Sequence, residues 1–325
     1  MPKRLTVLAT GGTIAGIAGS ATAADYRAGQ IGIGDYLERL AALGLDAELT
    51  GHQVANIDSA DMGHDVWAAL HAAAMRALHD QDCDGVVVTH GTDTLEETAF
   101  LLDLTLPAHK PVVVVGAMRP ADAVGYDGLR NVANAVRVAG DAGASERGVL
   151  VVMGDRVFAA RDVRKVRTRG SDAFRGFPRE SVALVTPSSL DWFGAAWRQD
   201  GAAQYALPNN WPDVPVVYVH AALEVGAVRR QLGDQPAGVI IAGAGEGNMP
   251  EPVRAELVEL CAGGVPVVRA SRVEQALVDR EPQDDTNGFV AARALTPAKA
   301  RLLLQLLLAQ GVRDAATIQT AFDGR

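Results

Sequence analysis

LTVLATGGTIAG, at residues 5–16, decides the fold class, because an apolar run passes directly into two glycines and a threonine. A second segment of the same design, DGVVVTHGTDTLEE, occupies residues 84–97. Short apolar runs like these are typical of strands buried in a parallel sheet. Each run ends in a threonine and has another threonine three residues later. Open α/β sheets bind ligands at the carboxyl ends of their strands, so the two turns predict a site built around threonine hydroxyls.

The rest of the chain alternates strands with helices. Further buried strands are predicted at residues 111–115, 149–153, 216–219, 238–242 and 266–269. Helical spacing predicts helices at residues 65–79, 95–104, 128–140 and 252–262. The helix at 95 begins with a capping-box pattern, Thr94 followed three residues later by Glu97. A final helix is predicted to start at Thr296-Pro297 and to stop near Gly311.

The domain organisation follows from a change of character between about residues 178 and 215. Prolines and tryptophans gather there and indicate an ordered but irregular connector. We therefore predict an α/β protein of two domains. A larger N-terminal domain with a mostly parallel sheet and flanking helices takes residues 1–190, and a linker takes 191–214. A smaller C-terminal α/β domain takes residues 215–325.

Composition excludes several classes of partner. The net charge of −9, with no basic stripe, argues against nucleic acid and against an anionic membrane surface. No apolar run approaches the ~20 residues of a membrane span, and too few apolar residues precede Gly11 for a signal peptide. Cys83 and Cys261 lack metal-ligand spacing and are expected to be free, buried or half-buried thiols. These features favour a cytoplasmic protein without a metal.

The first turn offers Thr13 as a candidate nucleophile. The two glycines before it allow a tight turn that exposes the next side chain, and a nucleophilic hydroxyl needs a neighbouring proton acceptor. Thr13 could equally hydrogen-bond its own loop, as threonines in turns often do. The small, glycine-rich residues 16–32 that follow carry one phenol, Tyr26. They suit either a lid that delivers a proton-transfer group or a plain flexible loop.

The second turn offers Thr92 and Asp93 at the start of a helix, whose positive end favours a nearby carboxylate or developing anion. Asp93 could bind a substrate ammonium or cap the helix. Thr94 is better explained as a cap than as a catalyst. His90 has no obvious orienting partner, so we expect a packed or backbone-bonded histidine.

Lys165 is unusual because the chain has only four lysines. It lies in AARDVRKVRT, among several arginines. A lysine amine crowded by cations can lose its proton and act as a base, which arginine cannot do. The alternative is an exposed basic strand edge.

Taken in order, these segments resemble the bacterial L-asparaginase family, and they look closest to the two-domain enzymes of the secreted type. The match runs nearly end to end. Its main motifs are TGGTIAG (10–16), NIDSADM (56–62), HGTDTLEETA (90–99), GAMRP (116–120), RDVRK (161–165) and GFVAARALTPAKARLLLQL (288–306). The resemblance implies an amidohydrolase that converts L-asparagine to L-aspartate and ammonia through a threonine nucleophile, without a cofactor.

The resemblance also assigns roles residue by residue. It implies six catalytic residues: Thr13, Tyr26, Thr92, Asp93, Lys165 and Glu281. It implies five substrate-binding residues: Gly12, Ser59, Asp93, Ala117 and Asn248. Ser59 would bind the substrate α-carboxylate and Asp93 its α-amine. Members of the family form homotetramers built from dimers, and Asn248 and Glu281 would serve the active site of a partner subunit.

Two positions depart from the family pattern. Ala60 stands where the family usually has glutamine or glutamate on the substrate amine, and such an unmade polar contact shifts binding by ~1–3 kcal/mol. Asp58, where a smaller residue is common, adds negative charge nearby. The disulfide of the secreted enzymes is absent, because Cys83 has no partner cysteine near residues 108–110.

The sequence is compatible with three other functions. Ala60 leaves room for a longer amide, which would suit a mixed glutaminase–asparaginase. GVIIAGAGEGNMPEP, at residues 238–252, suggests nucleotide binding, but its glycines only partly fit a dinucleotide fingerprint and no Walker sequence occurs. A catalytically inactive amino-acid-binding protein is the third.

Overall fold

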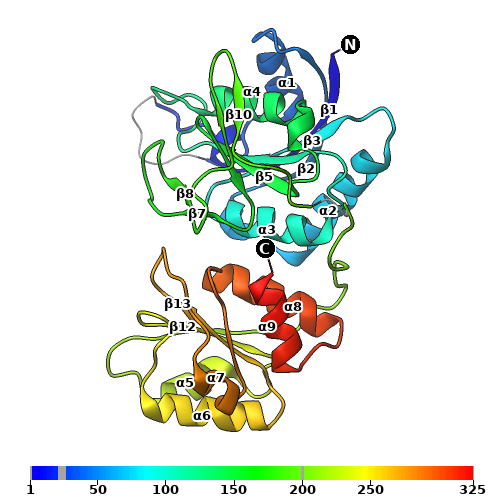
Figure 1. The fold of residues 1–325 in the computed structure, drawn as a ribbon. Helices are drawn as coiled ribbons and strands as arrows, with labels where there is room; N and C mark the ends of the chain where they lie inside the picture. Colours follow the sequence, from blue (N-terminus) through cyan, green and yellow to red (C-terminus); the bar gives the residue numbers. More distant parts are fainter. Residues whose placement is uncertain (1, 21–26, 199–200, 325) are drawn as a thin grey trace. The chain divides into compact units, whose positions relative to one another are not determined.

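The computed structural model describes residues 2–20, 27–198 and 201–324, and the chain divides into two compact units, Met1–Gln204 and Tyr205–Arg325 (Figure 1). The predicted fold class is confirmed: the first unit has a large, mostly parallel sheet and the second a smaller parallel one. The division between the units falls within residues 191–214, and the domain bounds given above stay a prediction.

The first unit is built on an eight-stranded sheet in the order β10-β9-β6-β5-β4-β3-β1-β2. The neighbouring strands from β2 to β5 run parallel to one another. β6 pairs antiparallel with β5, β9 with β6, and β10 with β9. Their bounds are β1 Lys3–Gly11, β2 Ala47–Ile57, β3 Gly85–Thr89, β4 Val112–Val115, β5 Val149–Met153, β6 Arg156–Ala159, β9 Ala183–Val185 and β10 Leu190–Trp192. A separate two-stranded sheet joins β7 (Val163–Lys165) to β8 (Phe174–Gly176).

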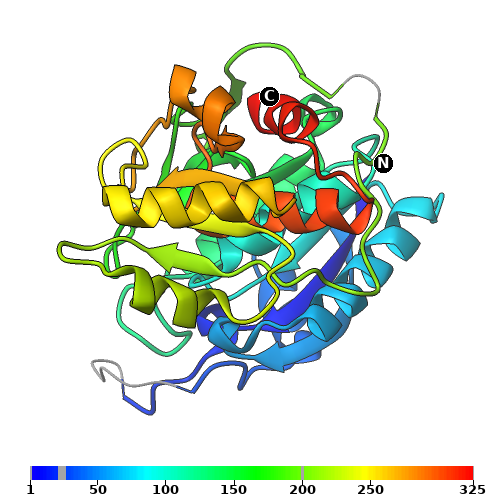
Figure 2. The same cartoon turned by 90° about the horizontal axis from the view of Figure 1, so that it is seen from below.

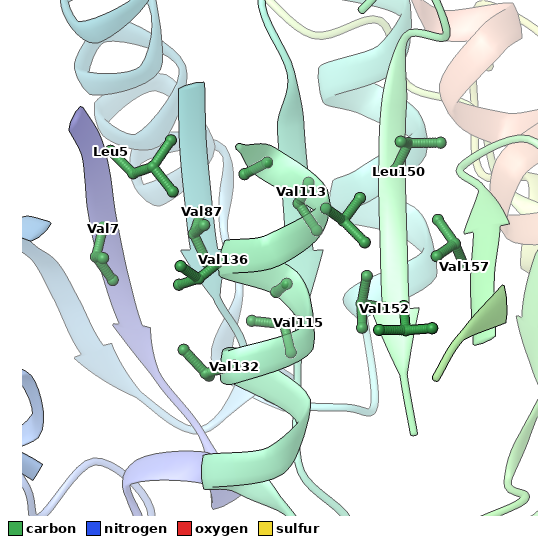
Figure 3. Close-up of a cluster of buried hydrophobic side chains, with 14 of the residues drawn as sticks. Leu5, Val7, Val87, Val113, Val115, Val132, Val136, Leu150, Val152 and Val157 are labelled. Carbon is green, nitrogen blue, oxygen red and sulfur yellow. The ribbon is translucent and has the colours of Figure 1, made fainter. Parts of the chain in front are cut away.

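Helices cover both faces of this sheet, because valines alternate between the faces of its central strands. Val87, Val113 and Val115 face α1 (Ile33–Ala41) and α4 (Gly128–Ala139), as Figure 3 shows for α4. Their neighbours Val86, Val88, Val112 and Val114 face α2 (His64–His79) and α3 (Leu95–Thr105). Each fully buried valine contributes about 1.5–3 kcal/mol. Burial on both faces explains why the central strands are uninterrupted apolar runs.

The second unit has four parallel strands in the order β11-β12-β13-β14: Val216–Tyr218, Val239–Gly243, Val267–Ser271 and Phe289–Ala291. Its first two helices, α5 (Val225–Leu232) and α6 (Glu251–Ala262), pack side by side (Figure 2). The others are α7 (Pro282–Asn287), α8 (Pro297–Ala309) and α9 (Ala315–Asp323). Thr296 caps α8 as predicted, accepting a hydrogen bond from the Lys299 amide.

Three sequence predictions were wrong. The connector expected at residues 178–215 contains β9 and β10, which extend the first sheet. These strands are three residues long, too short to leave a period-two signal. The helix at 297 is not the last, because Asp314 caps a further helix, α9, whose nine residues are too few to establish a helical period. The capping box at Thr94 does not form, because the Thr94 hydroxyl is hydrogen-bonded to the Ser59 carbonyl.

Candidate active site

The two glycine–threonine turns lie against each other at the carboxyl ends of neighbouring parallel strands, β1 and β3. Gly12 has a φ of +79°, and a Cβ atom there would lie 2.2 Å from the Gly91 Cα. A Cβ on Gly91 would lie 2.7 Å from the Ser59 Oγ. Only glycines allow the two backbones to approach so closely. Thr13 and Thr92, the residues that follow these glycines, are both buried in adjoining turns.

Ser59 connects a third segment to these turns. It begins a short 3-10 helix, η2 (Ser59–Asp61), capped by the Asp58 carboxylate, which accepts from the Ala60 amide at 3.0 Å. The Ser59 Oγ accepts a hydrogen bond from the Asp93 amide at 3.1 Å. The Thr94 hydroxyl donates to the Ser59 carbonyl at 2.7 Å. This bond takes the hydroxyl away from the start of α3, which explains why the predicted capping box is absent there.

Lys165 ends β7 and joins the second turn. Its Nζ donates to the Thr92 Oγ1 at 2.8 Å and to the Asp93 Oδ1 at 2.5 Å. The Lys165 side chain is only 17% exposed, whereas that of Asp93 is 59% exposed. The amine therefore lies beneath the solvent-facing carboxylate and within proton-transfer distance of the threonine hydroxyl. Its main-chain amide is held as well, donating to the Glu96 Oε2 at 2.6 Å.

The loop after β4 forms another wall against the Thr92 turn. A Cβ on Gly116 would lie 3.0 Å from the Thr92 Cγ2, and Ala117 beside it is buried. Asn131 donates to the Gly116 carbonyl at 3.0 Å. The Asp127 carboxylate accepts from the next main-chain amide along the loop, that of Met118, at 3.1 Å. These contacts fix the backbone on both sides of Ala117.

Sequence reasoning missed these supporting side chains. Asp127 and Asn131 are four residues apart at the start of α4, soon after the GAMRP motif, and that helical spacing is the signal that could have identified them. The contact between Glu96 and Lys165 carries no local signal, because it joins residues 69 positions apart.

His90 is a backbone-bonded histidine, as predicted. Its Nδ1 donates to the Gly91 carbonyl at 2.6 Å, so this nitrogen carries the proton. Burial lowers the pKa of His90 to about 4. Its Nε2 has no hydrogen-bond partner among the residues that the structure describes. The imidazole is therefore neutral at pH 7, and it holds the peptide group that leads into Thr92.

The other predicted residues lie elsewhere. Tyr26 lies outside the described residues. Asn248 and Glu281 belong to the second unit. Asn248 closes a backbone bridge with Ala244 after β12, and Glu281 is the N-cap residue of α7, where a capping box pairs it with Asp284.

Arg269 organises this part of the second unit. Its fully buried guanidinium donates to both carboxylate oxygens of Asp284, at 2.6 Å each. It also donates to the Glu246 carbonyl at 2.8 Å and to the Asp279 carbonyl at 3.1 Å. The turn that precedes Asn248 and the segment that precedes Glu281 are therefore attached to one side chain.

Comparison with known proteins identifies the family of this chain. Residues 4–198 match the family model "Asparaginase, N-terminal", and residues 213–322 match "Glutaminase/Asparaginase C-terminal domain". The chain belongs to the asparaginase family. This membership explains the succession of a large and a small parallel sheet.

Several members of the asparaginase family resemble the chain over nearly its whole length. L-asparaginase 2 of Escherichia coli is 39% identical over 98% of this chain and 92% of its own length. The glutaminase-asparaginase of Pseudomonas fluorescens is 35% identical over 98% and 89%. A crystal structure of a probable cytoplasmic L-asparaginase from Campylobacter jejuni superposes with a TM-score of 0.91 at 33% identity, covering 99% of this chain and all of the other.

Neither metal ligation nor a membrane span emerges from the described residues. Among residues 2–20, 27–198 and 201–324, no group of three or more histidine, cysteine or acidic side chains is arranged so that it could hold a metal ion. In the same ranges, no helix is long and apolar enough to cross a membrane. Both cysteines lie in these ranges and are free thiols, Cys83 buried and Cys261 half-buried, as predicted.

The contact between the turns predicts that Gly91→Ala impairs the site more than the fold. The added methyl overlaps Ser59 and the Gly12 backbone, and such overpacking costs about 1–3 kcal/mol. We expect kcat/KM to fall at least tenfold, measured with asparagine, while urea unfolding remains cooperative. Gly34→Ala is the control, because its methyl meets open space. An unaltered kcat/KM in Gly91→Ala would contradict the importance of this contact.

The buried His90 predicts a loss of stability in acid. The unfolded state takes up a proton below its pKa of about 6.5, whereas the folded state does so only near 4. Stability from this group is therefore complete above pH 6.5 and falls as the pH drops, by about 3 kcal/mol near pH 4. Urea unfolding at pH 7.5 and 4.5 should show a smaller difference for His90→Asn than for the natural chain. Equal differences would refute the assignment.

The Arg269–Asp284 pair predicts a large cost for removing one partner. Asp284→Ala removes the carboxylate that accepts two hydrogen bonds from a buried guanidinium and leaves the more distant Glu281 carboxylate at 3.7 Å, which costs about 3–5 kcal/mol of unfolding free energy. Asp285→Ala, which removes an exposed partner of Arg280, should cost far less, because solvent screens this pair. Urea denaturation of the two variants provides the measurement. Similar losses for both would show that the buried pair has no special weight.

Proposed function

We propose that the chain is an L-asparagine amidohydrolase, which hydrolyses L-asparagine to L-aspartate and ammonia through a threonine nucleophile. The observation that carries this proposal is the contact of Lys165 with Thr92 and Asp93, beside the glycine turn that holds Thr13. Names of relatives support the same substrate, since they include L-asparaginases.

The reaction needs a nucleophile, a proton acceptor and donors for the oxyanion, because an amide is a poor electrophile. The Thr13 Oγ gives up its proton as it attacks the side-chain carbonyl carbon, and the carbonyl oxygen becomes the oxyanion of a tetrahedral intermediate. The carbonyl then re-forms as the C–N bond breaks. The leaving nitrogen takes up one proton, which balances the proton that Thr13 lost, and departs as ammonia. Water then hydrolyses the acyl ester, releasing aspartate and restoring the Thr13 hydroxyl.

The second turn supplies the groups that handle protons and charge. A hydrogen bond of 2.8 Å joins the Lys165 Nζ to the Thr92 Oγ1, and a proton can pass along it. His90 holds the Gly91 carbonyl, and in a trans peptide the N–H of Thr92 then points the opposite way. That N–H is our candidate oxyanion donor. Because His90 is neutral and buried, it serves as a support for the turn.

The α-groups of the substrate are bound by Ser59 and Asp93. The Ser59 oxygen accepts from the Asp93 amide, which leaves its O–H able to donate to a carboxylate. The exposed Asp93 carboxylate accepts from the substrate ammonium. Gly12 and Ala117 line the substrate through their main chains. Tyr26 assists Thr13, while Asn248 and Glu281 complete the active site of a partner subunit in a tetramer built from dimers.

A mixed glutaminase–asparaginase is the second candidate, and Ala60 favours it. Its side chain is a single exposed methyl beside Ser59, which leaves space for a longer amide. Relatives of 33–35% identity include proteins named glutaminase-asparaginase.

We also propose that the enzyme works in the cytoplasm. Two free thiols and a structural relative described as a probable cytoplasmic L-asparaginase support this location. A curated relative from Haemophilus influenzae is described as periplasmic, and fractionation of cells distinguishes the two compartments.

The deciding experiment measures ammonia release from asparagine and from glutamine side by side. We expect a higher kcat/KM on asparagine, and comparable values would establish the mixed activity instead. Thr13→Ala and Thr92→Ala should each lower kcat by about 10³-fold or more while the oligomer persists. Thr50→Ala, an exposed threonine of β2, is the control. Substantial activity in either site variant would refute the mechanism, and asparagine binding without ammonia release would indicate an inactive binding protein.

Ala60→Gln should tighten substrate binding if an amine contact is missing. A new polar contact worth about 1–3 kcal/mol lowers KM for asparagine roughly 5- to 100-fold. Ala60→Leu has similar bulk without the amide and should not lower KM. An unchanged KM in Ala60→Gln would show that no contact is lacking.

A further inference from the structure

We propose that Glu96 is a positioning residue for Lys165: it fixes the main chain of β7 so that the lysine amine stays on Thr92 and Asp93. This inference rests on the proposed function of those three residues. It concerns a side chain to which neither the sequence motifs nor the proposed mechanism gives a role.

The geometry places both ends of Lys165 on one short segment. Its amine contacts Thr92 and Asp93, and its main-chain N–H donates to the Glu96 Oε2 at 2.6 Å. Residues 92–96 therefore hold the lysine at its backbone and at its tip. A lysine side chain is a flexible four-carbon stem. The position of its amine therefore depends on how firmly the backbone from which it starts is fixed.

The strand that carries Lys165 is short and lies outside the main sheet. β7 has three residues and pairs only with β8, outside the eight-stranded sheet. A two-stranded ribbon of this length is marginally stable by itself. Lys165 is its last residue, paired with Phe174, and its N–H is directed to Glu96. Val163 and Phe174 of this ribbon are buried in the same core cluster as Ala99 of α3, and the carboxylate adds a directed hydrogen bond at the end that carries Lys165.

Glu96 is well placed for this task. It lies in the first turn of α3, where the positive end of the helix stabilises a carboxylate. The side chain is half-buried, and a bond from an N–H to a carboxylate is about twice as strong as a neutral one. Thr92 and Asp93 lead into the same helix, so Glu96 moves with the groups that Lys165 must meet.

A series of substitutions at one position separates reach from charge. Glu96→Gln keeps an acceptor oxygen at the same distance and should leave kcat within about threefold. Glu96→Asp keeps the charge but shortens the side chain by one carbon, and Glu96→Ala removes it. Both should lower kcat about 10- to 100-fold, because each loses the hydrogen bond that fixes the backbone of Lys165 and so the position of its amine. KM should change much less than kcat.

Glu97→Ala is the matched control, since this glutamate is half-buried in the same helical turn. All variants are assayed as the full-length enzyme for kcat and KM on asparagine, with melting temperature as the measure of folding. A variant that loses kcat in proportion to its melting temperature, or equal losses in Glu96→Gln and Glu96→Ala, would overturn the positioning role.

Lys165→Met distinguishes failure of this inference from failure of the proposed function. If Lys165→Met is inactive while Glu96→Ala keeps natural kcat, only the role of Glu96 is refuted. If Lys165→Met itself keeps natural kcat, the proposed function of Lys165 is refuted, and with it the role of Glu96.

Discussion

The contact between Gly12 and Gly91 is the constraint on which the rest of the site depends. β1 and β3 are neighbours in the sheet, so the turns that follow them compete for the same space. A Cβ on Gly12 would overlap the Gly91 backbone, and one on Gly91 would overlap Ser59. With glycine at both places the two backbones touch, and Thr13 and Thr92 emerge from adjoining turns. Any larger residue would separate the hydroxyls that the proposed chemistry needs.

Around this contact, side chains hold main-chain groups in place. His90 fixes the Gly91 carbonyl, Ser59 the Asp93 amide, Asn131 the Gly116 carbonyl and Glu96 the Lys165 amide. Each bond sets the direction of a peptide group or the origin of a reactive side chain. Polar groups fixed before substrate arrives need little reorganisation during reaction, which is the usual source of electrostatic catalysis. Arg269 does the same for the loops of the second unit.

Much of the fold was predictable from local pattern. Buried strands such as β3 and β5 are apolar runs bounded by polar turns, and α8 carries a legible cap at Thr296. β9, β10 and α9 escaped prediction because three-residue strands and a nine-residue helix contain too few residues to establish a period. The capping box predicted at Thr94 was wrong for another reason. Its capping pattern is local, whereas its actual acceptor, the Ser59 carbonyl, is 35 residues away.

The sequence by itself determined the α/β class, the two threonine turns and, through resemblance to a family, the residues expected to act. It also predicted that His90 is packed or backbone-bonded, because no neighbouring residue in the sequence could orient it as a base. Only the tertiary structure decided which of these residues meet. Lys165 reaches Thr92 across 73 positions, and Glu96 reaches Lys165 across 69. Such contacts arise because sheet order and a separate two-stranded ribbon bring distant segments together, and periodicity within one segment carries no information about them.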